Sequence, residues 1–135
     1  MIEKKIVPVL CVGETLQERD SGLAEETVAA QLNAVLSALD EESLATLVVA
    51  YEPVWAIGTG KTATPEIAQS MHAFIRQLIA KRSVGLAESC SLLYGGSVNA
   101  ENASQLLAQK DIDGCLVGGA SLKVKDSTEI CETVG

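Results

Sequence analysis

One carboxylate stands where an apolar run meets a loop that contains glycine. Residues 47–50 are apolar and of strand length, and Glu52 follows them almost directly. Pro53 has no backbone N–H and so cannot continue a strand ladder, and Gly58 allows the backbone to come close to an anion. We therefore interpret Glu52 as a general base beside an anion site. The alternative is a solvated glutamate at the rim of the fold, because Glu side chains are usually exposed.

Two nucleotide-binding patterns compete for the same loop. Gly60-Lys61-Thr62 could end a phosphate-binding P-loop, but that pattern requires glycine where the chain has Trp55. Gly58-Thr59-Gly60 with Ala63 fits a permissive dinucleotide fingerprint, but residues 81 and 82 are basic where an acid that binds ribose is expected. The first pattern is therefore rejected, and the second is weak.

Two later turns offer backbone N–H groups to an anion. Gly95-Gly96-Ser97 follows an apolar run at residues 92–94, and Gly118-Gly119 follows another at 114–117. Backbone N–H groups that precede a helix bind phosphate without a basic side chain. A glycine pair after a strand is ordinarily only a tight turn. Two such pairs in consecutive units, together with the Gly58 loop, favour a phosphate site.

The elements that must position these residues alternate along the chain. Apolar runs predict strands over residues 6–12, 47–50, 92–94 and 114–117, the first of them buried on both faces. Helical spacing predicts helices over about 28–39, 65–79 and 99–107, and a last one from about 127 with Ile130, Cys131 and Val134 apolar. This order requires a parallel sheet covered by helices, in one α/β domain over residues 1–135. Glu14, Glu52 and the glycine turns all follow strand ends, the edge where such folds bind ligands.

The composition restricts partners and cofactors. The chain has 135 residues, of which 47% are hydrophobic, and a formal charge of −8, which argues against nucleic acid and anionic membranes as partners. There is no membrane-length apolar run and no signal-peptide pattern near the start, so the expected location is the cytoplasm. The four cysteines form no C-x-x-C pair and His72 is the sole histidine, so we expect free thiols, no metal site and no cofactor.

These motifs resemble the triosephosphate isomerase family over essentially the whole chain. Residues 8–15 are similar to that family's fifth strand, and residues 50–61, with the run Tyr51-Glu52-Pro53-Val54-Trp55, to its sixth strand and closing lid. Residues 94–98 are similar to the seventh strand and residues 114–122 to the eighth. The resemblance implies half of a (βα)8 barrel, with four consecutive βα units and parallel strands. It also implies interconversion of glyceraldehyde 3-phosphate and dihydroxyacetone phosphate.

The resemblance assigns roles residue by residue. Glu52 would be the general base that moves a proton during the isomerisation. Glu14 would support the first hinge of the lid without taking part in a catalytic step. Backbone N–H groups would hold the substrate phosphate at Gly58, Ser97, Gly118 and Gly119. The lid hinges would be Pro53, Val54 and Trp55 on one side and Lys61, Thr62 and Ala63 on the other.

Part of the family's machinery lies on strands that these residues do not match. The family's first four strands supply a lysine, a histidine that polarises the carbonyl, and the main dimer loop, and neither His72 nor Lys61 is placed to substitute. We therefore expect a split isomerase, with activity conditional on an N-terminal half supplied by a partner polypeptide. One alternative is a non-catalytic half-barrel that self-associates as a homodimer and keeps a phosphate site, since open strand edges and an uncovered apolar face favour association. Another is a fragment without a function of its own.

Overall fold

The fold is built on one parallel sheet of four strands. The computed structural model describes residues 6–59 and 61–133. Its strands are β1 (Val9–Val12), β2 (Val48–Tyr51), β3 (Leu92–Tyr94) and β4 (Gly114–Cys115), and they lie in the order β1-β2-β3-β4. Each crossover therefore joins adjacent strands, as in the wall of a (βα)8 barrel. The predicted α/β architecture of four βα units, consistent with half of such a barrel, is confirmed.

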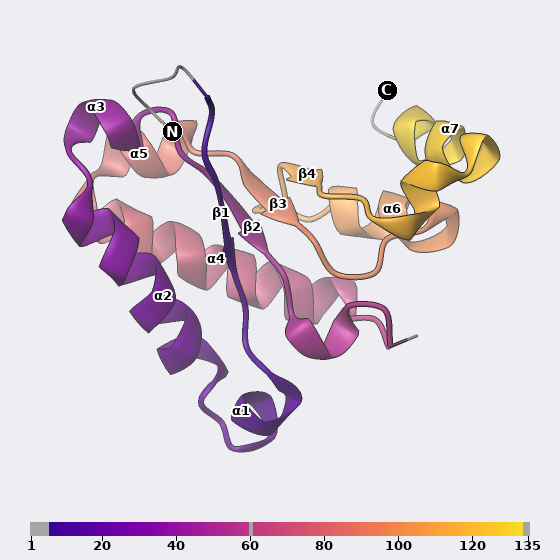
Figure 1. Ribbon diagram of the computed structural model, residues 1–135, viewed down its shortest axis with the longest axis horizontal. Helices are drawn as coiled ribbons and strands as arrows, with labels where there is room; N and C mark the ends of the chain where they lie inside the picture. The colour runs from indigo at the N-terminus through magenta and orange to yellow at the C-terminus, as the bar shows by residue number, and fades with distance from the viewer. Residues whose placement is uncertain (1–5, 60, 134–135) are drawn as a thin grey trace.

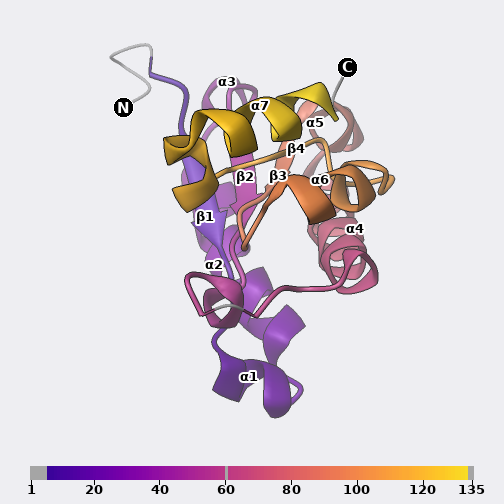
Figure 2. The same cartoon turned by 90° about the vertical axis from the view of Figure 1, so that its right-hand side faces the viewer.

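Helices fill every connection between the strands. They are α1 (Leu16–Asp20), α2 (Ala24–Ala38), α3 (Glu41–Leu44), α4 (Pro65–Arg82), α5 (Val84–Ser89), α6 (Ala100–Leu107) and α7 (Val124–Glu132), with 3-10 turns η2 (Val54–Ala56) and η3 (Gly119–Leu122). In Figure 1, α2 and α4 lie on the same side of the strands, and α6 and α7 lie together beyond β4. Figure 2 shows α6 and α7 from their own side. Gly60 of the lid and Val134 of the last predicted helix lie outside the described residues.

The core lies between the sheet and its covering helices. Tyr51 and Tyr94, at the ends of β2 and β3, are fully buried, as are Leu32 of α2 and Ile75 of α4. Burying each large apolar side chain stabilises the fold by roughly 1.5–3 kcal/mol. His72 of α4 is also fully buried, and its Nδ1 lies 3.0 Å from the Asp111 carbonyl oxygen. The histidine is therefore a packing residue beneath the sheet.

Three short helices are absent from the sequence prediction, and side-chain caps explain them. The Thr15 hydroxyl and the Glu18 carboxylate form a reciprocal capping box that begins α1. Asp40 accepts from the Ser43 N–H to begin α3, and the Ser83 hydroxyl caps α5. Residues 17–20 and 41–44 are consequently helical where only a charged connection was expected.

The expectation that the first strand is buried on both faces is wrong. The strand begins at Val9 and not at residue 6, and Val9 is 44% exposed. Cys11, which points to the same face as Val9, is also exposed. Among residues 6–59 and 61–133, helices cover only the other face, and β1 has a strand neighbour on one side alone. The fourth strand is also shorter than predicted and ends at Cys115.

The described residues contain neither a membrane-spanning helix nor a cluster of metal ligands. Within residues 6–59 and 61–133, no helix has both the length and the apolar character needed to cross a membrane. No group of three His, Cys, Asp or Glu side chains in the same ranges is arranged to hold a metal ion. All four cysteines are free thiols.

Candidate active site

Glu52 is the first residue after β2, and its backbone is tied to the strands on both sides. The Glu52 N–H donates to the Val12 carbonyl at 2.8 Å, and the Gly95 N–H donates to the Tyr51 carbonyl at 2.8 Å. The side chain of Glu52 is half-buried. The carboxylate therefore projects from a fixed piece of backbone at the carboxyl edge of the sheet, as the sequence predicts.

Two glycines make room for Glu52. A Cβ atom at Gly95 would lie 2.6 Å from Glu52 Cγ and 2.9 Å from its Oε1, so the carboxylate rests against the Gly95 backbone. A Cβ atom at Gly13 would lie 1.8 Å from the Glu52 carbonyl oxygen. Neither contact is visible in the sequence, because each depends on which residues of neighbouring strands are side by side.

The thiol of Cys11 faces the same carboxylate. Burial raises the pKa of Cys11 and the nearby negative charge of Glu52 raises it further, so the thiol stays protonated at neutral pH. Cys11 lies on β1, directly beside Ala50 of β2. Only this strand register brings the two side chains together, and the spacing of the cysteines gives no hint of it.

Glu14 is bonded to the residues predicted to form the first hinge of a lid. Its fully buried carboxylate Oε1 accepts from Arg19 Nη1 at 2.9 Å, Tyr51 Oη at 3.1 Å and Trp55 Nε1 at 2.8 Å. Its backbone carbonyl accepts from the Val54 N–H at 3.0 Å. Burial, and then the Glu14 charge, raise the pKa of Tyr51 well above its usual range, so the phenol remains a donor. The structure therefore joins Glu14 to both Val54 and Trp55 of the first hinge.

Arg19 makes a contact that is not predicted from the sequence. Its guanidinium carbon lies 5.1 Å from the centre of the Trp55 ring, in cation–π range, while the same side chain pairs with Glu14. The Thr15 and Glu18 capping box could have revealed the helix that carries Arg19. No local pattern indicates that this helix lies beside the tryptophan.

The middle of the predicted lid is bonded to the turn that follows β3. Pro53 and Ala56 are buried, and the Ala56 carbonyl accepts from the Ser97 N–H at 3.2 Å and the Ser97 hydroxyl at 2.6 Å. Gly58 has φ +66, a backbone conformation that favours glycine. The Ser97 N–H can reach a phosphate only if it releases Ala56.

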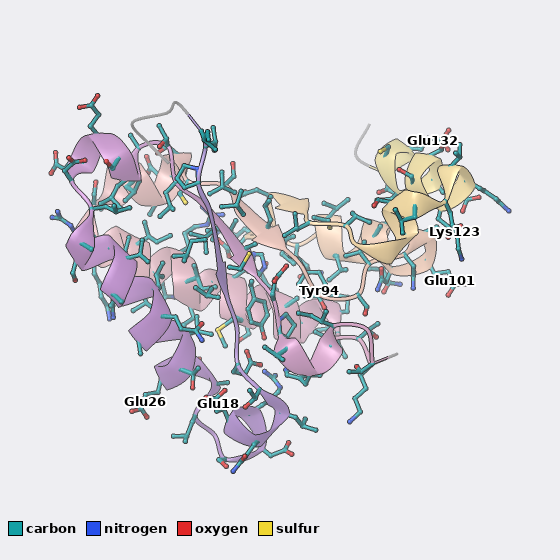
Figure 3. All side chains as sticks on the ribbon, viewed as in Figure 1. Glu18, Glu26, Tyr94, Glu101, Lys123 and Glu132 are labelled. Carbon is teal, nitrogen blue, oxygen red and sulfur yellow. The ribbon has the colours of Figure 1, made fainter. Side chains whose placement is uncertain are left out.

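The predicted second hinge of the lid, residues 61–63, lies just before α4. Lys61 and Thr62 are exposed, whereas Ala63 is buried. The Tyr94 hydroxyl lies near the Ala63 N–H without a hydrogen-bond partner among the described residues. Burial raises the pKa of Tyr94, so it too stays protonated. Figure 3 shows Tyr94 inside the molecule, so Ala63 lies next to a buried core residue.

All four predicted phosphate-binding residues line one cavity of about 300 Å³. They come from the predicted lid (Gly58), from the turn after β3 (Ser97) and from the turn after β4 (Gly118 and Gly119). Gly95 also lines the cavity, so the Glu52 side chain lies at its margin. Within the described part of the chain, the Gly118 and Gly119 N–H groups donate to no other residue. The described residues that line the cavity carry no charged side chain, so an anion here would be bound by backbone N–H groups.

Comparison with known proteins identifies the family. The sequence model of the family described as Triosephosphate isomerase matches residues 1–134. The chain belongs to the triosephosphate isomerase family. Its relatives include the triosephosphate isomerases of Nitrosococcus oceani and Alcanivorax borkumensis. The first is 55% identical over 130 residues, which are 96% of this chain and 52% of that protein. The second is 58% identical over 127 residues, or 94% of this chain and 51% of that protein.

A further relative is also matched over only about half of its own length. The triosephosphate isomerase of Hydrogenovibrio crunogenus is 52% identical over 134 residues, covering 99% of this chain but 53% of that protein. The chain therefore spans about half the length of the curated relatives it matches. The match to the family extends almost from end to end of this chain.

Proposed function

We propose that this chain supplies the base and the phosphate-binding loops of a triosephosphate isomerase, as strands five to eight of the family barrel. The observation that supports the proposal is the shared cavity. It joins the N–H groups of the lid and of two glycine turns to Gly95, against which the Glu52 carboxylate rests. A phosphate site and a base at one edge of a parallel sheet suit a small phosphorylated substrate.

The chemistry assigned to Glu52 is proton transfer between neighbouring carbons. With the phosphate held by Gly58, Ser97, Gly118 and Gly119, the carboxylate takes a proton from the carbon next to the substrate carbonyl. The resulting enediolate regains a proton at the former carbonyl carbon, and the hydroxyl and carbonyl exchange places. Substrate and product are isomers, so the step needs no oxidant or reductant.

Neither His72 nor Lys61 is placed to donate to the oxyanion that develops in this step. His72 lies in the core with its Nδ1 at the Asp111 carbonyl, and Lys61 is exposed in the lid. Losing one preorganised oxyanion donor typically costs about 10²–10³ in kcat. We therefore propose that isomerisation requires the family's first four strands. The chain combined with a polypeptide spanning the first half of the Nitrosococcus oceani enzyme is called the complemented complex below.

Titration with inorganic phosphate tests the anion site in the chain itself. We expect NMR shifts at the backbone amides of Gly58, Ser97, Gly118 and Gly119. We expect the Gly119→Val change to block binding, because Gly119 lines the cavity and a side chain there is accommodated without backbone strain or a clash within the protein. Gly85→Ala on α5 is the matched control, since its new methyl group also meets nothing closer than 4.0 Å. Shifts that persist in the Gly119→Val variant would contradict the proposed site.

A second candidate function is a self-associating half-barrel that binds phosphate without catalysis. Its support is apolar surface at the two ends of the sheet: Val9 on β1 is 44% exposed, and Leu122 and Val124 beyond β4 are 87% and 85% exposed. Light scattering over a dilution series, with and without phosphate, tests it. A stable dimer that binds phosphate, together with an inactive complemented complex, would favour this second function.

A further inference from the structure

We propose that Gln31, on the outer helix α2, is a positioning residue for the base Glu52; this inference rests on the proposed function. Its side-chain amide pairs with both backbone groups of one residue at the end of β1. The Gly13 N–H donates to Gln31 Oε1 at 2.9 Å, and Gln31 Nε2 donates to the Gly13 carbonyl at 3.0 Å. We call this pair of bonds the Gln31 clamp.

The clamp occupies the open edge of the sheet. The carbonyls of Val12 and Glu14 accept from the N–H groups of Glu52 and Val54, so these two residues face β2. Gly13 lies between them and turns its N–H and carbonyl to the opposite side, where β1 has no strand neighbour among the described residues. The amide of Gln31 therefore takes the place of a neighbouring strand at this one position. The backbone at residues 12–14 is held from both sides.

The clamped residue is in direct contact with the base. A Cβ atom at Gly13 would lie 1.8 Å from the Glu52 carbonyl oxygen, 2.6 Å from its carbonyl carbon and 3.3 Å from Pro53 N. Gly13 thus forms the surface on which the Glu52–Pro53 peptide group rests, at the junction of base and lid. The next residue, Glu14, holds Trp55 of the first hinge. A shift of Gly13 would move both the base and the hinge.

The chemistry of the clamp requires an amide side chain. A peptide group offers one donor and one acceptor on the same edge, and a glutamine amide presents the complementary pair. Gln31→Ala removes both partners. Gln31→Glu keeps an acceptor for the Gly13 N–H but sets a carboxylate oxygen against the Gly13 carbonyl until the carboxyl group is protonated. Asn33→Ala is the matched control, because Asn33 is an exposed amide on the same helix with no hydrogen bond to another described residue.

Amide hydrogen exchange in the chain tests the clamp without reference to activity. In Gln31→Ala we expect the Gly13 amide to exchange about two- to tenfold faster, as loss of one net hydrogen bond implies. The Gly95 amide is the internal reference, because it donates to the carbonyl of Tyr51 on the edge of β2 that faces away from β1. Unchanged exchange at Gly13 in Gln31→Ala would show that the clamp does not hold this backbone and would overturn the proposal.

Steady-state kinetics of the complemented complex test the positioning role. Small displacements of a reacting group cost up to about 10² in rate, so we expect Gln31→Ala to lower kcat about tenfold with KM within about twofold. Asn33→Ala should leave both unchanged. Gln31→Glu should lose as much at pH 8 and recover, relative to the unchanged chain, toward pH 5, because the protonated carboxyl group again donates to Gly13. A structural defect alone would not give this recovery.

The outcomes distinguish the positioning role of Gln31 from the proposed function. Faster exchange at Gly13 with unchanged kcat would overturn the positioning role and leave the proposed function intact. Inactivity of the complemented complex made with the unchanged chain would overturn the proposed function and the positioning role together. The exchange protection of Gly95 would then show that the chain was folded.

Discussion

Replacing Glu14 by alanine tests how the predicted first hinge of the lid is held. Three donors meet on the buried Glu14 Oε1: the Tyr51 hydroxyl, the Trp55 indole N–H and the Arg19 guanidinium. Glu14→Ala leaves the buried hydroxyl without its partner and removes the anchor of a half-buried indole. The exposed fraction of the Arg19 side chain is 27%, so water can solvate part of its charge.

The magnitude follows from these three environments. A buried donor left without its acceptor costs about 1–3 kcal/mol, and this applies to Tyr51 and in part to Trp55. The partly exposed ion pair with Arg19 adds at most about 1 kcal/mol, and removal of a buried carboxylate returns some desolvation energy. We expect Glu14→Ala to lower the free energy of unfolding by about 3 kcal/mol. Glu14→Gln, which keeps an acceptor oxygen of similar size, should lower it by about 1 kcal/mol.

Urea unfolding measures this difference at one fixed protein concentration. Trp55 is the only tryptophan of the chain, so its fluorescence reports the hinge, and far-UV circular dichroism reports the fold. Glu26→Ala on α2 is the control: Glu26 is exposed, forms no ion pair with another described residue and projects from the surface in Figure 3. It should change stability by less than about 0.5 kcal/mol. A loss below about 1 kcal/mol in Glu14→Ala would refute the reasoning.

Three further predictions concern the core and the base. Arg76 donates to Asp111 and Asp113 at 2.8 Å each, so Arg76→Lys should lower the free energy of unfolding by about 2 kcal/mol in urea; an unchanged midpoint would contradict the network. Burial lowers the pKa of His72 from 6.5 to about 4. As the pH falls, His72 is therefore protonated in the unfolded chain before it is protonated in the folded chain. Stability should fall from pH 6.5 to 4 by up to about 3 kcal/mol, and His72→Gln should remove that part of the pH dependence; equal slopes in both chains would refute it. Gly95→Ala should lower kcat of the complemented complex about 10²-fold, because the new methyl group would overlap the Glu52 side chain. An unchanged kcat would show that Glu52 does not need the space beside Gly95.

The order of the elements could be predicted because each leaves a local pattern. The apolar runs before Glu52, Gly95 and Gly118 are strand-like, and the carboxyl ends of parallel strands meet at one edge. This rule alone predicts that the three loops converge, and the cavity that they line agrees with it. The capping box of Thr15 and Glu18 is also a local signal, so the short helix α1 could have been predicted from the sequence.

The remaining contacts depend on register and on distance in space. Cys11 meets Glu52 because β1 and β2 pair with Cys11 beside Ala50, and a register shift of one residue would turn the thiol away. Gln31 reaches Gly13 across 18 positions, and its place on α2 is typical of a solvent-facing residue. The apolar run of β1 predicts burial on both faces, but burial depends on what covers the sheet and not on the strand itself.

We propose above that Glu52 is the base of an isomerase that needs four further strands. The most direct measurement is the rate of glyceraldehyde 3-phosphate isomerisation, free of host enzyme, for the chain alone and for the complemented complex, each with Glu52 intact and with Glu52→Gln. We predict negligible activity for the chain alone, clear activity for the complemented complex, and its loss in Glu52→Gln. Full activity of the chain alone, or a complemented complex that is unaffected by Glu52→Gln, would contradict the account.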